Sequence, residues 1–498
     1  MQHTAAMRGN QKNILRVLSR RQVVGGLLAS VPSASTAQLL PRPRPEGFGR
    51  LIEAASDDVF ATSGLSAVTA FTLRDLSNGR VLEQHNPRLA LPPASVTKIA
   101  TALYGRDALG ENHRFATQVM ITGPVRDGEV QGDLYLLGGG DPVMDTDGLA
   151  NLAKQVAGAG INSITGRFFV FGAALPRHYQ IDNSQPIDVG YNPAICGMNL
   201  NFNRVYFQWK RTSDGISLQM TARSTKYDTP VRSIDVSLAR RASPVFDLKS
   251  DNGLDRWSVA SSALNREGSR WLPVRAPDVY AGEVFRALAH SMKVRLPDAS
   301  MTKSVPSGSV VAQELGAEFT PLMRTMLKYS TNLTAEVTGL RAAQANGNKP
   351  RDIAASSSSM TSWLRRQYGV SRVTFKNHSG LTDRTRLTAD EMVQILDIAA
   401  HDGFLGDVLR EFALKGPGGK AAYARGVNVQ AKTGTLNYTR GLSGYLNGKS
   451  GKKFAFAIFA ADLDARAGRA KLGPKTWLGK ARGQEQALLQ QWALKYAG

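Results

Sequence analysis

The sequence of 498 residues has a single cysteine, Cys196, so no disulfide framework can form within the chain. It also lacks the H-E-x-x-H motif and the paired Cys/His spacings of metal sites, and we therefore predict no metal and no other cofactor. Without a convincing histidine partner, Cys196 is expected to be a small buried residue rather than a catalytic thiol. His378 and His401 are expected to be surface or capping residues. No run of about 20 apolar residues follows the N-terminal region, so no integral membrane segment is expected in the mature chain.

Acidic residues are scarce relative to basic ones. The 40 Asp and Glu residues stand against 62 Lys and Arg residues, which gives a net charge of +22. The basic residues are scattered, and no zinc-finger or RNA-binding signature accompanies them, so no nucleic-acid partner is predicted. We expect the basic surface to meet anionic wall polymers or other anionic polymers of the outer surface. The hydrophobic content of 42% is ordinary for a folded soluble protein.

The first 37 residues have the layout of a signal peptide. Five basic residues and no acidic residue precede an apolar run at 23–31, and Ser35-Thr36-Ala37 offers small residues for cleavage. The pair Arg20-Arg21 resembles part of a twin-arginine signal, and an ordinary secretory signal is the alternative. The protein is therefore predicted to be exported to the periplasm.

Three short motifs occur in a fixed order along the chain. Ser95-Val96-Thr97-Lys98 comes first, Ser330-Thr331-Asn332 second and Lys432-Thr433-Gly434-Thr435 third. This order of a Ser/Lys, a Ser/Asn and a K-T-G motif is typical of penicillin-binding proteins and class A β-lactamases. Each motif alone is weak, but the three together predict one acyl-transfer site.

Two other segments fit the S-x-x-K pattern. Ser95 is preferred because prolines precede a predicted helix over 98–104, and only a helix brings a Ser and a Lys three residues apart onto one face. Ser300 and Ser450 lie among Pro, Gly and Ser residues and are predicted to lie in surface loops.

The middle motif also has a competitor, Ser250-Asp251-Asn252, which resembles a turn. Ser330 instead separates two predicted helices, at 321–327 and 334–340. A short break between packed helices can aim Ser and Asn side chains into a cleft, so Ser330 is preferred.

The stretch between the first two motifs is too long for one connection within a compact domain. We predict a strand-rich inserted domain at 113–276, which splits a catalytic domain into 38–112 and 277–498. The expected fold class is α/β (α+β), with an antiparallel sheet flanked by helices. Its expected elements are a hairpin within 66–86, strands at 441–446 and 454–459, and a terminal helix at 484–495.

Four further segments resemble those of a known family: Gly138–Pro142, Tyr191–Asn201, Ser379–Thr382 and Gly441–Tyr445. With the three motifs and the long insertion, they are similar to the class C low-molecular-mass penicillin-binding proteins, the D-alanyl-D-alanine carboxypeptidase/endopeptidase family. The resemblance covers nearly all of the mature chain and implies a transpeptidase domain like that of penicillin-binding proteins and β-lactamases. The chain departs from the family at Asn377-His378, where an acidic residue and Gly are usual, and in the shorter stretch at 181–186.

The resemblance implies a serine DD-peptidase of peptidoglycan metabolism. Such an enzyme hydrolyses D-Ala-D-Ala termini, and as an endopeptidase peptide cross-links, through an acyl-enzyme. Its partners would be peptidoglycan peptide stems, with β-lactams as covalent inhibitors. Ser95 would be the nucleophile and a neutral Lys98 its base.

The other motif residues would bind the substrate and move protons. By the same resemblance, Ser330 and Lys432 would bring a proton to the leaving amine, and Asn332 would hold the substrate amide. Lys432 and the segment Thr433-Gly434-Thr435 would bind the terminal carboxylate side of the peptide. The backbone N–H groups of Ser95 and Thr435 would form the oxyanion hole.

Two alternatives remain at this stage, a serine β-lactamase and a non-catalytic wall-binding protein. The absence of any Glu between Glu336 and Glu391 counts against efficient β-lactam hydrolysis, because a class A β-lactamase places a deacylating Glu in that interval.

Overall fold

The computed structural model describes residues 59, 64–65, 67–415, 426–449 and 451–497. The predicted signal peptide at 1–37 and Ser450 lie outside these residues. No helix in the described part of the chain is long and apolar enough to cross a membrane.

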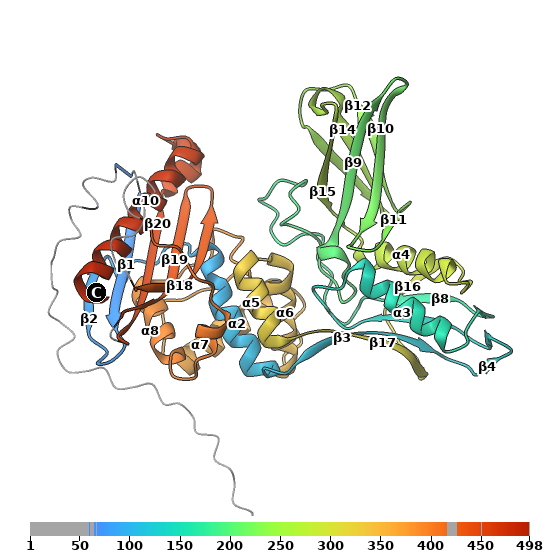
Figure 1. Cartoon of the computed structure of the whole chain (residues 1–498), viewed down its shortest axis with the longest axis horizontal. Helices are drawn as coiled ribbons and strands as arrows, with labels where there is room; N and C mark the ends of the chain where they lie inside the picture. Colours follow the sequence, from blue (N-terminus) through green and yellow to red (C-terminus); the bar gives the residue numbers. More distant parts are fainter. Residues whose placement is uncertain (1–58, 60–63, 66, 416–425, 450, 498) are drawn as a thin grey trace, which may run out of the picture. The chain divides into compact units, whose positions relative to one another are not determined.

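A five-stranded antiparallel sheet joins the beginning and the end of the chain (Figure 1). Its strands, in the order β18-β19-β20-β1-β2, are Asn428–Leu436, Thr439–Asn447, Lys453–Ala461, Val68–Asp75 and Val81–His85. The central contact is the pairing of β1 with β20, which brings the predicted hairpin at 66–86 beside the predicted strand at 454–459. The K-T-G segment lies in β18, at the edge of the sheet.

Both faces of this sheet are buried, and β20 illustrates how its sequence achieves this. Ala455, Ala457 and Phe459 face one core, whereas Phe456 and Ile458 face another, because successive side chains of a strand point to opposite sides. The first core is covered by helices α2 (Thr97–Leu109), α5 (Phe319–Tyr329), α6 (Asn332–Ala345), α7 (Ile353–Tyr368), α8 (Ala389–Ala399) and α9 (Phe404–Val408). The predicted helices at 98–104, 321–327 and 334–340 are confirmed as parts of α2, α5 and α6.

The opposite face is covered by α10 (Pro474–Trp492) and the π-helical turn η6 (Ala493–Ala497). The helix therefore begins ten residues earlier than the predicted 484–495. Its first half contains Gly479 and Gly483, which lower helix propensity and conceal the periodicity, whereas Pro474 at the start fits the first turn of a helix.

A second five-stranded sheet, in the order β16-β8-β6-β3-β17, is built from the region after α2. Its strands in that order are Ala299–Thr302, Phe168–Phe171, Leu134–Gly138, Arg114–Ile121 and Ser309–Glu318, and helices α3 (Thr146–Gly158) and α4 (Pro277–Ser291) pack with it. Because β16 pairs with β8 and β17 pairs with β3, residues 299–318 share a sheet with the predicted insert. A small sheet of β4 (Val125–Arg126), β5 (Glu129–Val130) and β7 (Ser163–Ile164) adjoins it in sequence.

Two further sheets share a core of aromatic and aliphatic side chains that includes Phe207, Phe246 and Trp257. One has the order β11-β10-β9-β15, with strands Asp228–Pro230, Gly215–Arg223, Arg204–Thr212 and Glu267–Pro273. The other has the order β12-β14-β13, with strands Ile234–Ala239, Leu254–Ala260 and Phe246–Asp251. The prediction that this region is rich in strands is confirmed. Cys196 is buried here as predicted, and its thiol donates to Met198 O.

Candidate active site

Ser95 lies in a tight turn that depends on neighbouring glycines. It sits in the 3₁₀ turn η1 (Ala94–Val96), directly before α2, and Ala94 has a φ of 47°, a strained value for a residue with a side chain. A Cβ added to Gly380 would lie 1.9 Å from Ala94 O, and one added to Gly434 would lie 2.9 Å from Ser95 N. Only glycine leaves room for this turn, so the K-T-G strand and the S-G-L segment together hold Ser95 in position.

Lys98 is completely buried beside Ser95. Its Nζ atom donates to Ser95 Oγ at 3.0 Å, to Asn332 Oδ1 at 2.7 Å and to Ser379 O at 2.7 Å. Burial lowers the pKa of Lys98 from 10.5 to about 7, and the charge of Glu336 opposes this shift. None of the ion pairs among the described residues includes Lys98, so no carboxylate holds this amine in its charged form by direct contact.

The Glu336 carboxylate lies below this site and was missed by the sequence reasoning. It is fully buried on α6, one helical turn after Asn332, and accepts hydrogen bonds from His378 N at 3.0 Å and Ser379 N at 2.8 Å. Burial raises the pKa of Glu336. By fixing the backbone at Ser379, the carboxylate positions the carbonyl that accepts from Lys98.

His378 is fully buried, so the prediction that it is a surface or capping residue is wrong, whereas His401 is exposed as predicted. The His378 ring contacts Ser356 Oγ through Nε2 at 2.8 Å, and burial lowers the pKa of His378 to about 3. A Cβ added to Gly339 would lie 2.1 Å from this ring. Gly339 thus leaves room for the side chain of His378, a residue that stands where the similar family usually has glycine.

Ser330 and Lys432 approach from the other side. Ser330 ends α5 in the left-handed conformation, with φ 59° and ψ 38°, and α6 begins two residues later at Asn332. Lys432 is buried, and its Nζ atom donates to Ser330 Oγ at 3.0 Å and to Thr433 O at 2.6 Å. Burial first, and then the charges of Lys98, Arg410 and Arg440, lower the pKa of Lys432. The three predicted motifs therefore meet in one site.

Thr433 and Thr435 on β18 are half-buried and exposed, respectively, and Gly434 between them is buried. The hydroxyl of Thr435 accepts a hydrogen bond from Arg440 Nη1 at 2.8 Å. Arg440 is itself held by Glu485 of α10 in a buried ion pair at 2.8 Å. Sequence reasoning missed Arg440 and Glu485. The short connection between the K-T-G segment and the next strand could have placed Arg440 opposite Thr435, which is where the structure has it.

The competing motifs lie elsewhere. Ser250 and Asp251 are the last two residues of β13, and the turn lies at Asn252-Gly253, so the predicted turn is confirmed only in its second half. Ser300 lies in β16, where it pairs with the strand at Phe168–Phe171, so the prediction of a surface loop is wrong. The Pro and Gly residues around Ser300 delimit this short strand rather than replace it. No group of three or more His, Cys, Asp or Glu residues suited to a metal ion occurs in the described part of the chain.

Comparison with known families decides the class of protein to which this site belongs. The profile of the D-Ala-D-Ala carboxypeptidase 3 (S13) family matches residues 53–476. The chain belongs to this family. The resemblance inferred from the motifs is thereby confirmed, and the chain is a serine peptidase of the D-Ala-D-Ala carboxypeptidase type.

Individual relatives agree with the S13 assignment. The chain is 26% identical over 454 residues to a D-alanyl-D-alanine carboxypeptidase of Actinomadura sp. strain R39, covering 79% of this chain and 77% of the relative. It is 21% identical over 439 residues to the D-alanyl-D-alanine carboxypeptidase DacB of Haemophilus influenzae, covering 81% and 88%. The crystal structure of penicillin-binding protein 4 from H. influenzae is similar in fold, with a TM-score of 0.70 at 17% identity, over 88% of this chain and 99% of that chain. The predicted fold class is confirmed.

Proposed function

We propose that this S13 protein hydrolyses the D-Ala-D-Ala termini of peptidoglycan peptide stems and, as an endopeptidase, the peptide cross-links between stems. The observation that carries the proposal is the 3.0 Å contact from Lys98 Nζ to Ser95 Oγ, made by an amine whose pKa lies at about 7. About half of such an amine is neutral at pH 7, so it can accept the proton of a serine hydroxyl.

In the acylation step, Ser95 Oγ attacks the carbonyl carbon of the penultimate D-alanine while its proton passes to Lys98 Nζ. The carbonyl oxygen takes up negative charge and accepts hydrogen bonds from the N–H groups of Ser95 and Thr435. The close approach of Gly434 to the Ser95 amide supports this assignment, because it brings β18 beside the turn that carries Ser95.

The C–N bond then breaks, and the leaving D-alanine amine takes a proton through Ser330, which is hydrogen-bonded to Lys432. Asn332 holds the substrate amide, and Lys432 and Thr433 bind the terminal carboxylate. Water attacks the Ser95 ester and gives up its proton to Ser330 and Lys432, while Lys98 returns to Ser95 Oγ the proton that it took, so the free hydroxyl is restored. A β-lactam would acylate the same oxygen and leave a slowly hydrolysed ester.

The test is covalent labelling of the purified protein with a fluorescent penicillin. Ser95→Ala should abolish labelling, and the matched control Ser300→Ala, in the competing S-x-x-K segment, should label like the wild type. Labelling that persists in Ser95→Ala would contradict the proposal. Incubation with isolated wall fragments, followed by mass analysis of the products, would separate carboxypeptidase from endopeptidase activity.

The alternatives are not favoured. A serine β-lactamase is disfavoured by the match of the chain to a carboxypeptidase family over residues 53–476. A wall-binding protein without catalysis has no use for a buried lysine within hydrogen-bonding distance of a serine. Sustained turnover of nitrocefin would favour the first alternative.

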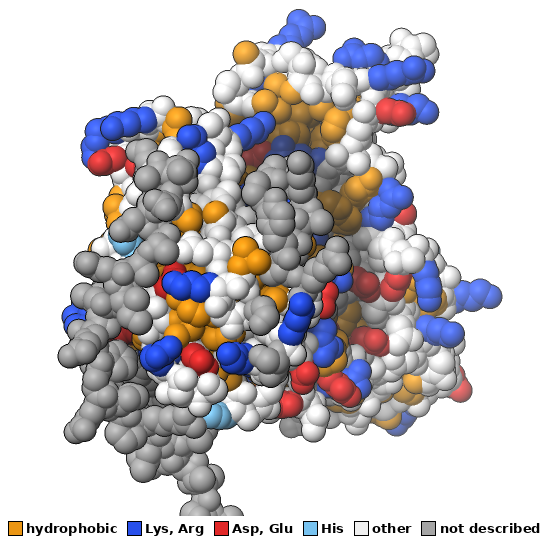
Figure 2. Space-filling view, turned by 60° about the vertical axis from the view of Figure 1, so that its left-hand side comes forward, with side chains coloured by type: hydrophobic (Ala, Val, Ile, Leu, Met, Phe, Trp, Pro, Cys, Tyr) orange, Lys and Arg blue, Asp and Glu red, His pale blue; other side chains and the backbone are white. Residues whose placement is uncertain are grey.

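Location and surface partners follow from the charge pattern. Residues 1–37 direct export, and the mature protein acts in the periplasm, where its basic surface meets anionic polymers. Figure 2 supports a diffuse electrostatic contact, since Lys and Arg side chains are spread over the visible face rather than gathered in one stripe.

The strand pairings of β16 and β17 support a return of the chain to the catalytic domain near residue 319 instead of the predicted 277, which leaves 113–318 as the insert.

A further inference from the structure

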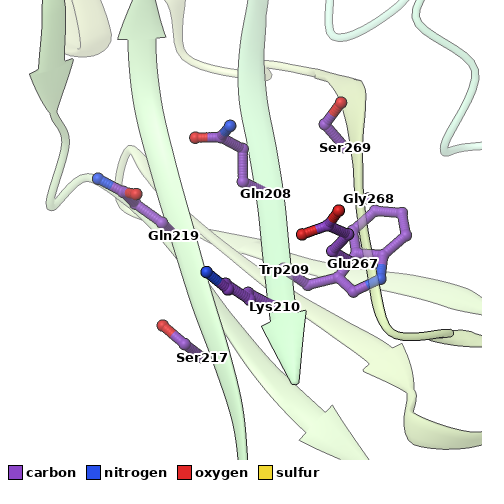
Figure 3. Close-up of a pocket in the computed structure, with 8 residues that line it drawn as sticks. All are labelled: Gln208, Trp209, Lys210, Ser217, Gln219, Glu267, Gly268 and Ser269. Atoms are coloured by element: carbon purple, nitrogen blue, oxygen red, sulfur yellow. The ribbon is translucent and has the colours of Figure 1, made fainter. Parts of the chain in front are cut away.

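A polar groove lies on the sheet β11-β10-β9-β15, whose strands are distant from Ser95 in the sequence. It is lined by residues of three neighbouring strands, namely Gln208, Trp209, Lys210, Ser217, Gln219, Glu267, Gly268 and Ser269 (Figure 3), and its volume is about 500 Å³. The side-chain amides of Gln208 and Gln219 make no hydrogen bond to any of the described residues. The floor of the groove therefore offers two free amides.

The strand register arranges the groove side chains in rows. Gln208 is paired with Gln219 on β10 and with Ser269 on β15, so two amides and a hydroxyl lie side by side. In the next row, Lys210 lies between Ser217 and Glu267, so the charges balance. Amides and hydroxyls each donate and accept, which suits a ligand rich in hydroxyl and acetamido groups better than an anion.

Aromatic side chains continue the same face of the sheet. Two residues before Gln208 and two residues after Ser269 stand Tyr206 and Trp271, whose ring centroids are 4.9 Å apart. Both rings are half-buried, and the guanidinium group of Arg204 lies over Trp271 at 5.3 Å. Aromatic rings next to hydrogen-bonding groups suit sugars, which present both apolar C–H faces and hydroxyls.

A loop connects this face with the active site. A Cβ added to Gly190 would lie 3.2 Å from the Arg204 side chain and 3.3 Å from Trp271 O. The next residue, Tyr191, is 50% exposed, and its carbonyl accepts a hydrogen bond from Asn332 Nδ2 at 2.9 Å. Asn332 in turn contacts Lys98. The loop thus links the aromatic end of the groove to the residues around Ser95.

We propose that the groove and the aromatic residues that continue it bind the sugar strand of peptidoglycan. The ligand class is an uncharged β-1,4-linked chain of N-acetylated hexosamines, held by the amides of Gln208 and Gln219 and packed on Tyr206 and Trp271. The inference rests on the proposed function, since the sugar strand carries the peptide stems that would reach Ser95. Its effect is to favour stems that are still attached to the polymer over free peptides.

The test uses the full-length protein and a β-1,4-linked N-acetylglucosamine hexasaccharide, which carries neither peptide nor charge. Calorimetry should give a Kd about tenfold higher for the double variant Gln208→Ala/Gln219→Ala than for the wild type, as expected for the loss of two hydrogen-bonding amides. The control Gln131→Ala removes an exposed amide from another part of the insert and should bind like the wild type. The double variant should also lose about tenfold in its rate on intact sacculi, while turnover of a free D-Ala-D-Ala peptide stays within about twofold of the wild type.

Two sets of results separate this inference from the proposed function. Equal hexasaccharide binding by wild type and double variant, no binding by either, or weakened binding only of an anionic polymer would overturn the glycan site while leaving peptide turnover intact. A wild type that binds the hexasaccharide but neither cleaves peptides nor reacts with penicillin would overturn the proposed function alone. The melting temperature of the double variant, measured in parallel, should equal that of the wild type, because both glutamines lie on an accessible sheet face.

Discussion

Arg440 on β19 and Glu485 on α10 form an ion pair between the sheet β18-β19-β20-β1-β2 and the helix that covers it, and their side chains are only 6% and 3% exposed. The same guanidinium donates to the hydroxyl of Thr435 at 2.8 Å, so α10 on the far face of the sheet helps to fix the K-T-G strand. Burial raises the pKa of Glu485, and Arg440 opposes this shift. The pair therefore connects the stability of the fold with the geometry of the proposed oxyanion hole.

We expect Glu485→Gln to lower the free energy of unfolding by about 3 kcal/mol, because it leaves the charge of Arg440 buried without a counterion. The double variant Arg440→Met/Glu485→Leu should be closer to the wild type in stability, since both charges are removed together. Chemical denaturation of the four proteins in this cycle checks the expectation. Equal losses in the single and double variants would show that the pair does not act as a unit.

The acylation rate should depend on pH through Lys98. Burial lowers the pKa of Lys98 to about 7, and the neutral amine is the proposed base, so the rate constant should rise with pH through about 7 and level off above it. Stopped-flow measurement with a chromogenic β-lactam between pH 5.5 and 9 tests this profile. Lys98→Arg, which stays charged throughout the range, should lose roughly a thousandfold or more at every pH. A flat profile in the wild type would rule out Lys98 as the titrating base.

Lys432 is proposed to read the terminal carboxylate of the peptide. Lys432→Gln should lower kcat/KM about a hundredfold for a peptide with a free carboxylate, since a charge-assisted hydrogen bond in a buried site is lost. A peptide with a terminal carboxamide should react slowly with the wild type and should lose a smaller factor in the variant, because only the part of Lys432 in proton delivery through Ser330 is then removed. If the variant lost the same factor with both peptides, Lys432 would act in proton delivery and not on the carboxylate.

Carboxylate binding should also shift the titration of Lys432. In the free protein, burial and the charges of Lys98, Arg410 and Arg440 lower the pKa of this lysine, and a bound carboxylate would raise the pKa again. Binding of a peptide ligand to the inactive variant Ser95→Ala should therefore take up protons in the pH window between the pKa of Lys432 in the free protein and its pKa in the complex. Calorimetry in buffers of different ionisation enthalpy measures this uptake, and Lys432→Gln in the same background is the control.

Gly339 and His378 form a pair of complementary size below the site. Gly339→Ala should lower the free energy of unfolding by more than about 2 kcal/mol, because the new Cβ would lie 2.1 Å from the buried imidazole. His378→Ala alone leaves a cavity and should also destabilise the protein. In the double variant the added methyl group partly fills that cavity, so its loss should be smaller than the sum of the two single losses. Strict additivity, measured by denaturation, would contradict direct packing.

The positions of the proposed active-site residues could be inferred from local sequence. Prolines before a good helical segment identified Ser95 and Lys98, and the break between two predicted helices identified Ser330 and Asn332. These inferences depend on spacing along a helix or a strand, which is fixed within a few residues. The continuous apolar run at 454–459 likewise indicated a buried strand.

Other features were decided only by tertiary structure. Glu336 lies under the Ser95 turn, Arg440 pairs with Glu485, and His378 is buried against Gly339. Each of these contacts joins segments that are remote in sequence. Only His378 among these residues was assigned a position from the sequence, and it was wrongly placed at the surface, because local patterns do not reveal a partner that offsets the cost of burial. The sequence by itself determined which groups could do the chemistry. The packing of distant strands and helices determined how they are held, how burial shifts the lysine pKa values, and where a polar groove opens on the sheet β11-β10-β9-β15.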